Sequence, residues 1–175
     1  MTNFTLVPEQ PGHADTIEAL VAEAFGPDRL HKTVYKLRDG IEPIGELGWV
    51  ALDQDGQLQA SIRHWPIAID RRWPAVLLGP VAVKPEMQGK GMGKALIRRT
   101  LALATSLGHR ICVLVGDREY YEPFGFENAA KRGLELPGWV DLDRFQVKAL
   151  VPGALNGVSG MIGKPIEPSV VRLRA

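Results

Sequence analysis

The chain has 175 residues, with 21 lysines and arginines against 20 aspartates and glutamates and a formal net charge of +1. A chain of this length buries most of its unfolded-state surface in one core and is too short for two ordinary domains. The near-neutral charge gives no reason to expect a nucleic acid or an anionic membrane surface as a partner.

The number of cysteines and the first residues of the chain bear on the cellular compartment of the protein. Cys112 is the single cysteine, so no intramolecular disulfide can form, and its place inside an apolar run favours a buried side chain over a nucleophile. Residues 1–4 are not a basic segment followed by an apolar one, and no run approaches the length of a membrane span. These features predict a cytoplasmic protein without a membrane partner.

Strand and helix patterns alternate at the start of the chain. Residues 4–7 form a candidate strand that ends at a proline, and residues 15–25 place apolar side chains at helical spacing before a Gly-Pro stop. A second helix is predicted over residues 28–37. Its apolar face would consist of Leu30, Val34 and Leu37.

A hairpin is predicted next. Residues 46–52 and 58–69 are strand-like and are joined by the turn sequence Asp-Gln-Asp-Gly at residues 53–56. Because proline cannot donate to a ladder, the Trp-Pro pair at 65–66 indicates a sheet edge or a bulge.

A strand–helix–strand unit occupies the middle of the chain. Residues 75–83 predict an apolar strand, a helix follows to Leu107, and residues 111–115 predict the next strand, which pairs in parallel by default. Gly108 suits the end of the helix. The helix face expected to be buried contains Leu96, Thr100, Leu103 and Leu107.

The last part of the chain divides into a closing strand and an extension. Residues 143–151 predict the closing strand, and from residue 152 onward glycine and proline are frequent. We therefore expect one domain over residues 1–151 and an irregular extension over residues 152–175 that packs on the same domain.

Three glycines, Gly89, Gly91 and Gly93, lie between the apolar strand and the helix that follows it. Glycine lets backbone N–H groups approach a phosphate closely, and a helix N-terminus adds unpaired N–H groups and a positive dipole end. The spacing excludes a Walker A loop, because Gln88 stands at its first glycine and Ala95 at its serine or threonine. It also excludes the G-x-G-x-x-G dinucleotide pattern. The loop predicts a pyrophosphate site of another kind.

A second motif lies downstream of this loop. The chain reads Gln-x-x-Gly-x-Gly at residues 88–93 after a Val-x-Val strand, and Tyr-x-x-x-Gly-Phe at residues 121–126 after the next strand. Together the two motifs resemble the GNAT N-acetyltransferase superfamily, and the surrounding residues look most like its YhbS-type branch of predicted acetyltransferases. The resemblance covers roughly the first 150 residues, and the sharp matches lie within residues 77–126.

The resemblance implies a layered α/β fold, with a central mixed and mostly antiparallel sheet that splays at the cofactor site and helices on both faces. It implies acetyl-CoA as the cofactor and direct transfer of the acetyl group to a primary amine in a ternary complex. Strand backbone would hold the pantetheine arm, and loop N–H groups would hold the pyrophosphate. The implied cofactor-binding residues are Val81, Ala82, Val83, Gln88, Gly89, Lys90, Gly91, Met92, Gly93 and Lys94.

The resemblance also implies a catalytic tyrosine. Tyr121 matches the tyrosine that recurs in the family and would be the general acid toward the coenzyme A sulfur. Tyr120 takes that role if the short helix is rotated by one residue. The general base stays open between Glu46, His64 and a water molecule. Candidate residues for an acceptor cleft are Phe25, His31, Trp49, Trp65 and Trp139.

The sequence lacks the residue spacing of common zinc sites. No His-Glu-x-x-His or Cys-x-x-Cys spacing exists for zinc, so we expect no metal.

The expected partner is a small-molecule or peptide amine, with the chain a monomer or a homodimer. Two alternatives stay open: a non-catalytic acyl-CoA-binding or regulatory module, and an acyltransferase for a protein or aminoacyl-tRNA amine. The charge argues mildly against tRNA.

Overall fold

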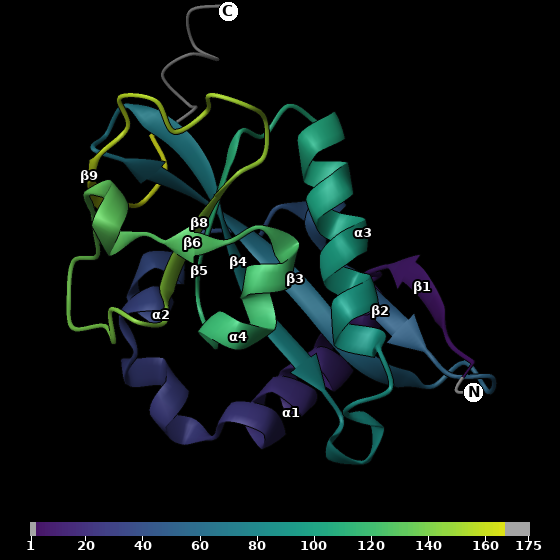
Figure 1. Cartoon of the computed structure of the whole chain (residues 1–175). Helices are drawn as coiled ribbons and strands as arrows, with labels where there is room; N and C mark the ends of the chain where they lie inside the picture. Colours follow the sequence, from purple (N-terminus) through teal and green to yellow (C-terminus); the bar gives the residue numbers. More distant parts are fainter. Residues whose placement is uncertain (1–2, 167–175) are drawn as a thin grey trace, which may run out of the picture.

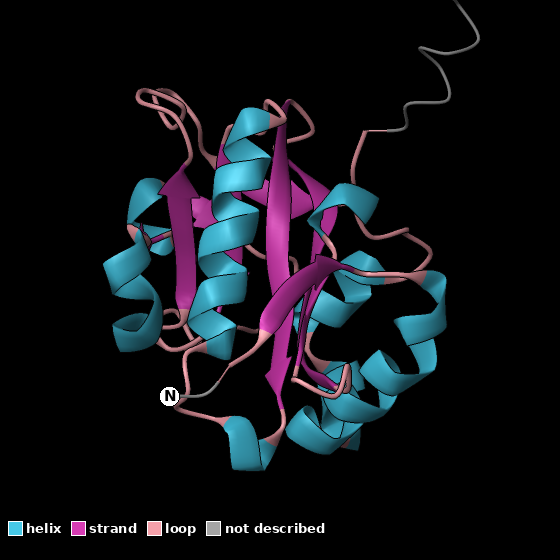
Figure 2. Cartoon of the chain, turned by 90° about the vertical axis from the view of Figure 1, so that its right-hand side faces the viewer, coloured by secondary structure: helices cyan, strands magenta, loops and turns pink. Residues whose placement is uncertain are grey.

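The computed structural model describes residues 3–166, which form one mixed sheet with helices on both faces (Figure 1, Figure 2). Residues 167–175, which end the expected extension, lie outside the described residues, as do residues 1 and 2. The strands are β1 (Thr5–Pro8), β2 (Trp49–Leu52), β3 (Leu58–Ile69), β4 (Trp73–Val83), β5 (Ile111–Val115), β6 (Glu127–Asn128), β7 (Leu134–Glu135), β8 (Phe145–Ala149) and β9 (Gly160–Gly163). The α-helices are α1 (Ala14–Phe25), α2 (Thr33–Arg38), α3 (Met92–Ser106) and α4 (Arg118–Tyr121).

The strand order in the sheet is β1-β2-β3-β4-β5-β8-β6, with β9 on the end of β3 and β7 on β9. Neighbours along the main path are antiparallel except for β4 and β5, which are parallel as the strand–helix–strand pattern predicts. The expectation of a mixed, mostly antiparallel sheet is confirmed.

Helices cover the sheet on opposite faces because side chains alternate along the central strands (Figure 1). Val76 and Leu78 of β4 pack beneath α3, in a cluster with Met92, whereas Leu77 points to the other face and packs with Leu37 of α2. Helix α1 closes a third cluster over β2 and the end of β4. Among residues 3–166, no helix is both long enough and apolar enough to cross a membrane.

The sheet opens where β4 and β5 part. The two strands pair only at Val76 and Leu77, after which β4 runs on to Val83. Between its pairs with His64 and Ile62, β4 advances by three residues while β3 advances by two, so β4 carries a β-bulge at residues 79–80. The β5-facing edge of β4 beyond Leu77 therefore has no strand partner in the described part of the chain. This is the expected splay.

The second helix differs from its prediction. Residues 28–37 do not form one helix: a 3-10 helix over Pro27–His31 is followed by an extended Lys32 and then by α2. The break places the hydroxyl of Thr33 2.7 Å from the carbonyl oxygen of Trp139, to which it donates a hydrogen bond. Leu37 is buried as expected, but Leu30 is 60% exposed. A long-range contact thus overrides the local helical pattern.

Two further segments were predicted wrongly. The strand expected from residue 46 begins only at Trp49, because Gly45–Leu47 forms a 3-10 helix anchored by the N–H of Ile44 on the carbonyl of His64. The extension expected to be irregular contains β9, which pairs with β3 through Ala68 and Ile69. A four-residue strand rich in glycine has no alternating pattern to reveal it, so only its partner defines it.

The remaining expectations need smaller adjustments. Helix α3 ends one residue earlier than expected. Leu96 and Thr100 are buried as expected, whereas Leu107 is 48% exposed, and Ile97 and Leu101 belong to the buried face as well. The Trp-Pro pair at 65–66 lies just beyond the bulge and beyond the last residue of β3 that pairs with β2, in agreement with an edge or bulge.

Candidate active site

A cavity of about 1160 Å³ opens where β4 and β5 part, and three groups of residues line it. The first group, which we call the loop wall, comprises the lining residues of β4, the glycine-rich loop and the start of α3, within 78–83 and 87–94. The second, the α2 wall, comprises the lining residues within 24–38 and 136–144. The end of β5 and helix α4 lie between them and contribute Val115, Gly116, Asp117, Tyr120 and Tyr121.

The loop presents backbone donors and open space. Gly89 and Gly91 have positive φ angles of 79° and 89°, and a Cβ built on either one would meet nothing within 4 Å. In the described chain, the N–H groups of residues 89–94 donate to no protein acceptor, since the first such bond runs from Ala95 to Gly91. These donors surround the N-terminus of α3, which favours an anion. The loop thus fits the pyrophosphate of coenzyme A.

Gly93 has a different local reason to be glycine. A Cβ at this position would lie 2.8 Å from the Tyr120 hydroxyl and 3.5 Å from a methyl of Val83. The absent side chain therefore lets α4 approach the first turn of α3. The basic side chain beside it, Lys94, lies with its Nζ 5.9 Å from the centre of the Tyr120 ring.

The β4 edge expected to bind a pantetheine arm lies on the cavity. Val81, Ala82 and Val83 all line it, with Ala82 buried beneath α1 and the two valines half-buried toward α3. Gln88 and Met92 line the same wall, whereas Lys90 does not. The unpaired strand edge and the loop form one continuous surface.

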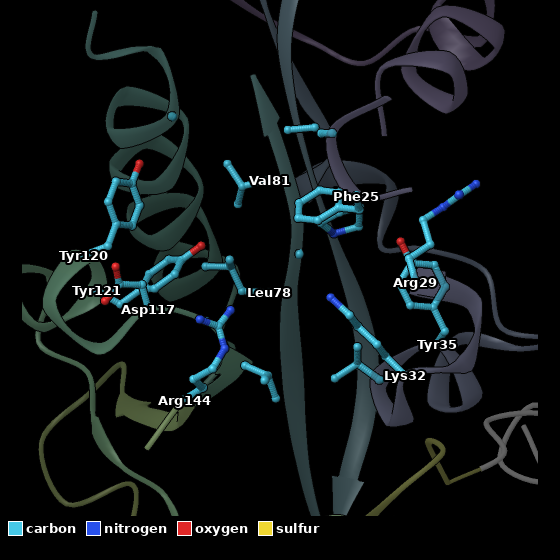
Figure 3. A pocket seen from close by; sticks show the side chains of 18 of the residues that line it. Phe25, Arg29, Lys32, Tyr35, Leu78, Val81, Asp117, Tyr120, Tyr121 and Arg144 are labelled. Atoms are coloured by element: carbon cyan, nitrogen blue, oxygen red, sulfur yellow. The ribbon is translucent and has the colours of Figure 1, made fainter. Parts of the chain in front are cut away.

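The two adjacent tyrosines of α4 lie in different surroundings. Figure 3 shows the Tyr121 hydroxyl directed toward Leu78 and the interior of the cavity, whereas the Tyr120 side chain points along α3. The Tyr121 ring lies against Gly116, where a Cβ would come within 2.6 Å of it. Burial raises the pKa of Tyr121 well above its ordinary value, with Tyr120 adding to the rise and Arg144 opposing it. Tyr121 therefore keeps its proton at neutral pH.

The expected cleft residues divide into two sets. Phe25, His31 and Trp139 line the α2 wall. Trp49 and Trp65 do not line the cavity: Trp49 Nε1 donates to the carbonyl of Glu46, and Trp65 Nε1 donates to the carbonyl of Gly79 at 2.7 Å. Trp65 thus stabilises the β-bulge through this hydrogen bond without lining the cavity.

Neither side chain considered as general base lies at the cavity. Glu46 is exposed in the 3-10 helix that precedes β2, and His64 is fully buried with Nδ1 3.0 Å from the carbonyl oxygen of Leu47. Burial lowers the pKa of His64 to about 4, so the imidazole is neutral at physiological pH. Cys112 is also buried, as expected, and burial raises the pKa of its thiol.

Sequence reasoning missed several cations of the α2 wall. Lys32 and Arg144 point into the cavity from opposite sides (Figure 3), and Arg38 lines it from α2. These residues come from segments more than 100 positions apart, and no spacing links them. The sequence held one local signal of this site, the Gly-Pro pair at residues 79–80. It indicates an edge without a strand partner, because proline cannot donate to a ladder inside an apolar strand.

Comparison with known proteins decides the family. The model of the acetyltransferase (GNAT) domain matches residues 45–128. Among curated relatives, the uncharacterized N-acetyltransferase YhbS of Escherichia coli K12 is 33% identical over 157 residues, which cover 88% of this chain and 92% of YhbS. The chain belongs to the GNAT acetyltransferase family. The range matched by the family model contains the loop wall and α4 but not the α2 wall.

Solved structures agree with the GNAT assignment. The crystal structure of E. coli YhbS in complex with CoA has a TM-score of 0.79 and 30% sequence identity to this chain, and the match covers 98% of this chain and 94% of YhbS. A GNAT acetyltransferase from Brucella melitensis, in complex with acetyl-CoA, has a TM-score of 0.66 and 30% identity, with coverage of 87% and 91%. The expected GNAT fold is confirmed.

Proposed function

We propose that the chain is an acetyl-CoA-dependent N-acetyltransferase that moves the acetyl group directly to a primary amine. The observation that carries this proposal is the continuity of the free β4 edge with a loop whose N–H groups at residues 89–94 have no protein acceptor in the described chain. A strand edge suits the amide-bearing pantetheine arm, and the loop suits the pyrophosphate. The relatives crystallised with CoA and acetyl-CoA support the same cofactor.

The residues that would hold the cofactor are those predicted from the sequence. The backbone of Val81 to Val83 would pair with the pantetheine amides, and N–H groups from Gly89 to Lys94 would donate to the pyrophosphate. The N–H of Gln88, which was also predicted to donate, bonds to the carbonyl of Pro85 instead. When bound, acetyl-CoA supplies a thioester, whose carbonyl carbon accepts the amine. The chain's own contribution is to orient the donor and to exclude water between β4 and β5.

Tyr121 is the residue that we propose as general acid. Its hydroxyl is directed toward Leu78, where the splay begins, and its raised pKa keeps a proton available for the departing sulfur. Tyr120, the alternative, points along α3 and has its hydroxyl against Gly93. With Glu46 and His64 away from the cavity, the acceptor loses its proton to water or binds as the free amine. The buried Cys112 is consistent with a cytoplasmic location.

Thermal denaturation tests the proposal. Acetyl-CoA at about 100 times its Kd adds about 2.7 kcal/mol to the free energy of unfolding, which raises Tm by about 5 °C or more in a domain of this size. NAD and ATP at the same concentration should leave Tm unchanged. The absence of a shift with millimolar acetyl-CoA would refute the proposal. A shift without thiol release from any amine would favour a non-catalytic acyl-CoA-binding module.

A further inference from the structure

Arg38 is a partly buried cation without a counter-ion among residues 3–166. Its Nε and Nη1 atoms are inaccessible and have no hydrogen-bond partner among residues 3–166, and no carboxylate there forms an ion pair with it. Burial lowers the pKa of Arg38 to about 10, with Tyr35 acting in the opposite direction, so the guanidinium stays charged at neutral pH. A buried, unpaired charge is costly unless a partner arrives.

Aromatic rings hold this guanidinium in place. Its Cζ lies 4.6 Å from the centre of the Tyr35 ring and 5.5 Å from the centre of the Trp65 ring. Such contacts partly offset the cost of burial, and they fix the plane of the guanidinium. Nη2 is not among the inaccessible atoms, and Arg38 lines the cavity, so Nη2 is the nitrogen that a ligand can reach.

The position of Arg38 relates it to the proposed reaction centre. The Arg38 Nη2 atom lies 3.4 Å from the position that a Cβ on Gly79 would take. Gly79 lies two positions after Leu77, the last residue of β4 that pairs with β5. Trp65 joins the two, because its Nε1 donates to the Gly79 carbonyl. The guanidinium therefore lies beside the splay, on the side opposite Tyr121.

Cationic side chains outnumber acidic ones among the residues that line the cavity. Six cationic side chains line it, Arg29, Lys32, Lys36, Arg38, Lys94 and Arg144, against three acidic ones, Asp28, Asp117 and Asp141. Of the acidic ones, Asp117 accepts from the N–H of Glu119 and Asp141 from the N–H of Asp143, so both are engaged in local turns. A polycationic acceptor would find few free carboxylates here.

We infer that the amine acceptor also carries a carboxylate, as a free amino acid does, and that Arg38 binds this carboxylate beside the splay. The inference rests on the proposed function, since it names the acceptor of that same site. Nη2 carries two N–H groups that can donate to a carboxylate oxygen, and the ion pair neutralises the charge of the guanidinium. The closeness of Gly79 to the splay places the carboxylate near the acetyl group, which suits an amine and an acid within one small molecule. Lys32 and Arg144 attract the anion from the rim.

The test uses pairs of acceptors that differ only in the carboxylate: alanine and ethylamine, leucine and isoamylamine, phenylalanine and phenethylamine. Release of the CoA thiol is measured at fixed acetyl-CoA for the wild type, Arg38→Met and Arg38→Lys. We expect the wild type to prefer at least one amino acid, with kcat/KM on the order of 100-fold above that of its amine. Arg38→Met should lower kcat/KM for the amino acid far more than for its amine and so remove this preference, and Arg38→Lys should restore part of it.

Arg72→Met is the matched control, because Arg72 also stacks on a tryptophan, with its Cζ 4.5 Å from the Trp73 ring, but does not line the cavity. It should keep the acid preference. A purely structural role for Arg38 predicts an equal loss for both members of a pair, and this result would overturn the inference. Preference for the amines, or for phosphoethanolamine over every amino acid, would also overturn it.

A binding measurement covers the case in which no acceptor of the panel reacts. With CoA bound, N-acetylalanine, N-acetylleucine or N-acetylphenylalanine should raise Tm further in the wild type and not in Arg38→Met, and N-ethylacetamide should not. Failure of all three carboxylates to stabilise the CoA complex would overturn the inference and leave the proposed function intact. Failure of CoA itself to stabilise the protein would instead refute the proposed function.

Discussion

The two walls of the cavity are built in different ways. The loop wall comes from one stretch of the chain, residues 78–94, and presents mainly backbone, with Gly89 and Gly91 in conformations that favour glycine. The α2 wall brings together side chains from residues 24–38 and 136–144, joined by the hydrogen bond from Thr33 to Trp139. Backbone recognition depends on local conformation, so it leaves a contiguous motif. Side-chain recognition depends on tertiary packing, so it leaves none.

The largest effect should come from the hydroxyl that lies between the two walls. Tyr121→Phe should lower kcat by about 1,000-fold while changing the Kd of acetyl-CoA by less than about twofold, because a general acid acts only in the reaction. Stopped-flow or steady-state thiol release measures the rate, and titration calorimetry the affinity. Tyr120→Phe is the control and should retain most of the rate. If Tyr120→Phe is the slower variant, Tyr120 is the general acid instead.

His64→Asn tests whether this buried histidine, which lies away from the cavity, acts as the general base. Its pKa is about 4 in the folded chain against 6.5 when unfolded, so the unfolded chain binds more protons between these values and stability falls as pH drops through this window. The loss by pH 4 should be about 3 kcal/mol. His64→Asn should flatten this part of the pH profile of urea unfolding by that amount. Its kcat at neutral pH should stay close to that of the wild type, and a loss of about 100-fold would contradict the position assigned to His64.

Gly91 tests the loop wall directly. Gly91→Val should weaken acetyl-CoA binding by about 100-fold, or about 2.7 kcal/mol, because the side chain would occupy the open space in front of the loop donors and oppose the positive φ. Gly56→Val is a close control, since Gly56 also has a positive φ, 77°, and open space, but lies in the β2–β3 turn. Titration calorimetry should show normal binding for the control. Equal weakening in both variants would attribute the effect to backbone strain.

The smallest effect should come from the link within the α2 wall. Thr33→Val removes the hydrogen bond to the Trp139 carbonyl and should cost about 1 kcal/mol of unfolding free energy. The acceptor KM should rise severalfold while the Kd of acetyl-CoA stays constant. Thr105→Val is the control, because its hydroxyl bonds only to Leu101 of the same helix. A rise in the Kd of acetyl-CoA for Thr33→Val would show that the two walls are not independent.

Most of the secondary structure was predictable because it follows from local patterns. The strand over residues 58–69 and the strand over residues 111–115 agree with the structure at both ends. The first follows a clear turn sequence, and the second is an apolar run that ends at a glycine. The face of α3 was predicted less well. Leu107 fits the helical spacing but lies past the end of the sheet-covering helix, whereas Ile97 and Leu101 face the core. Spacing gives the period of a helix, and packing selects its buried side.

The sequence by itself determined the family, the strand–loop–helix unit and the residues proposed to hold the cofactor, because a phosphate-binding backbone needs particular residues at consecutive positions. Only the tertiary structure decided which side chains face the acceptor. It removed Glu46, His64, Trp49 and Trp65 from the cavity. It also brought Arg38 to the splay, against Gly79. Such contacts join residues that are distant in the chain, so packing across the sheet decides them, and local pattern does not.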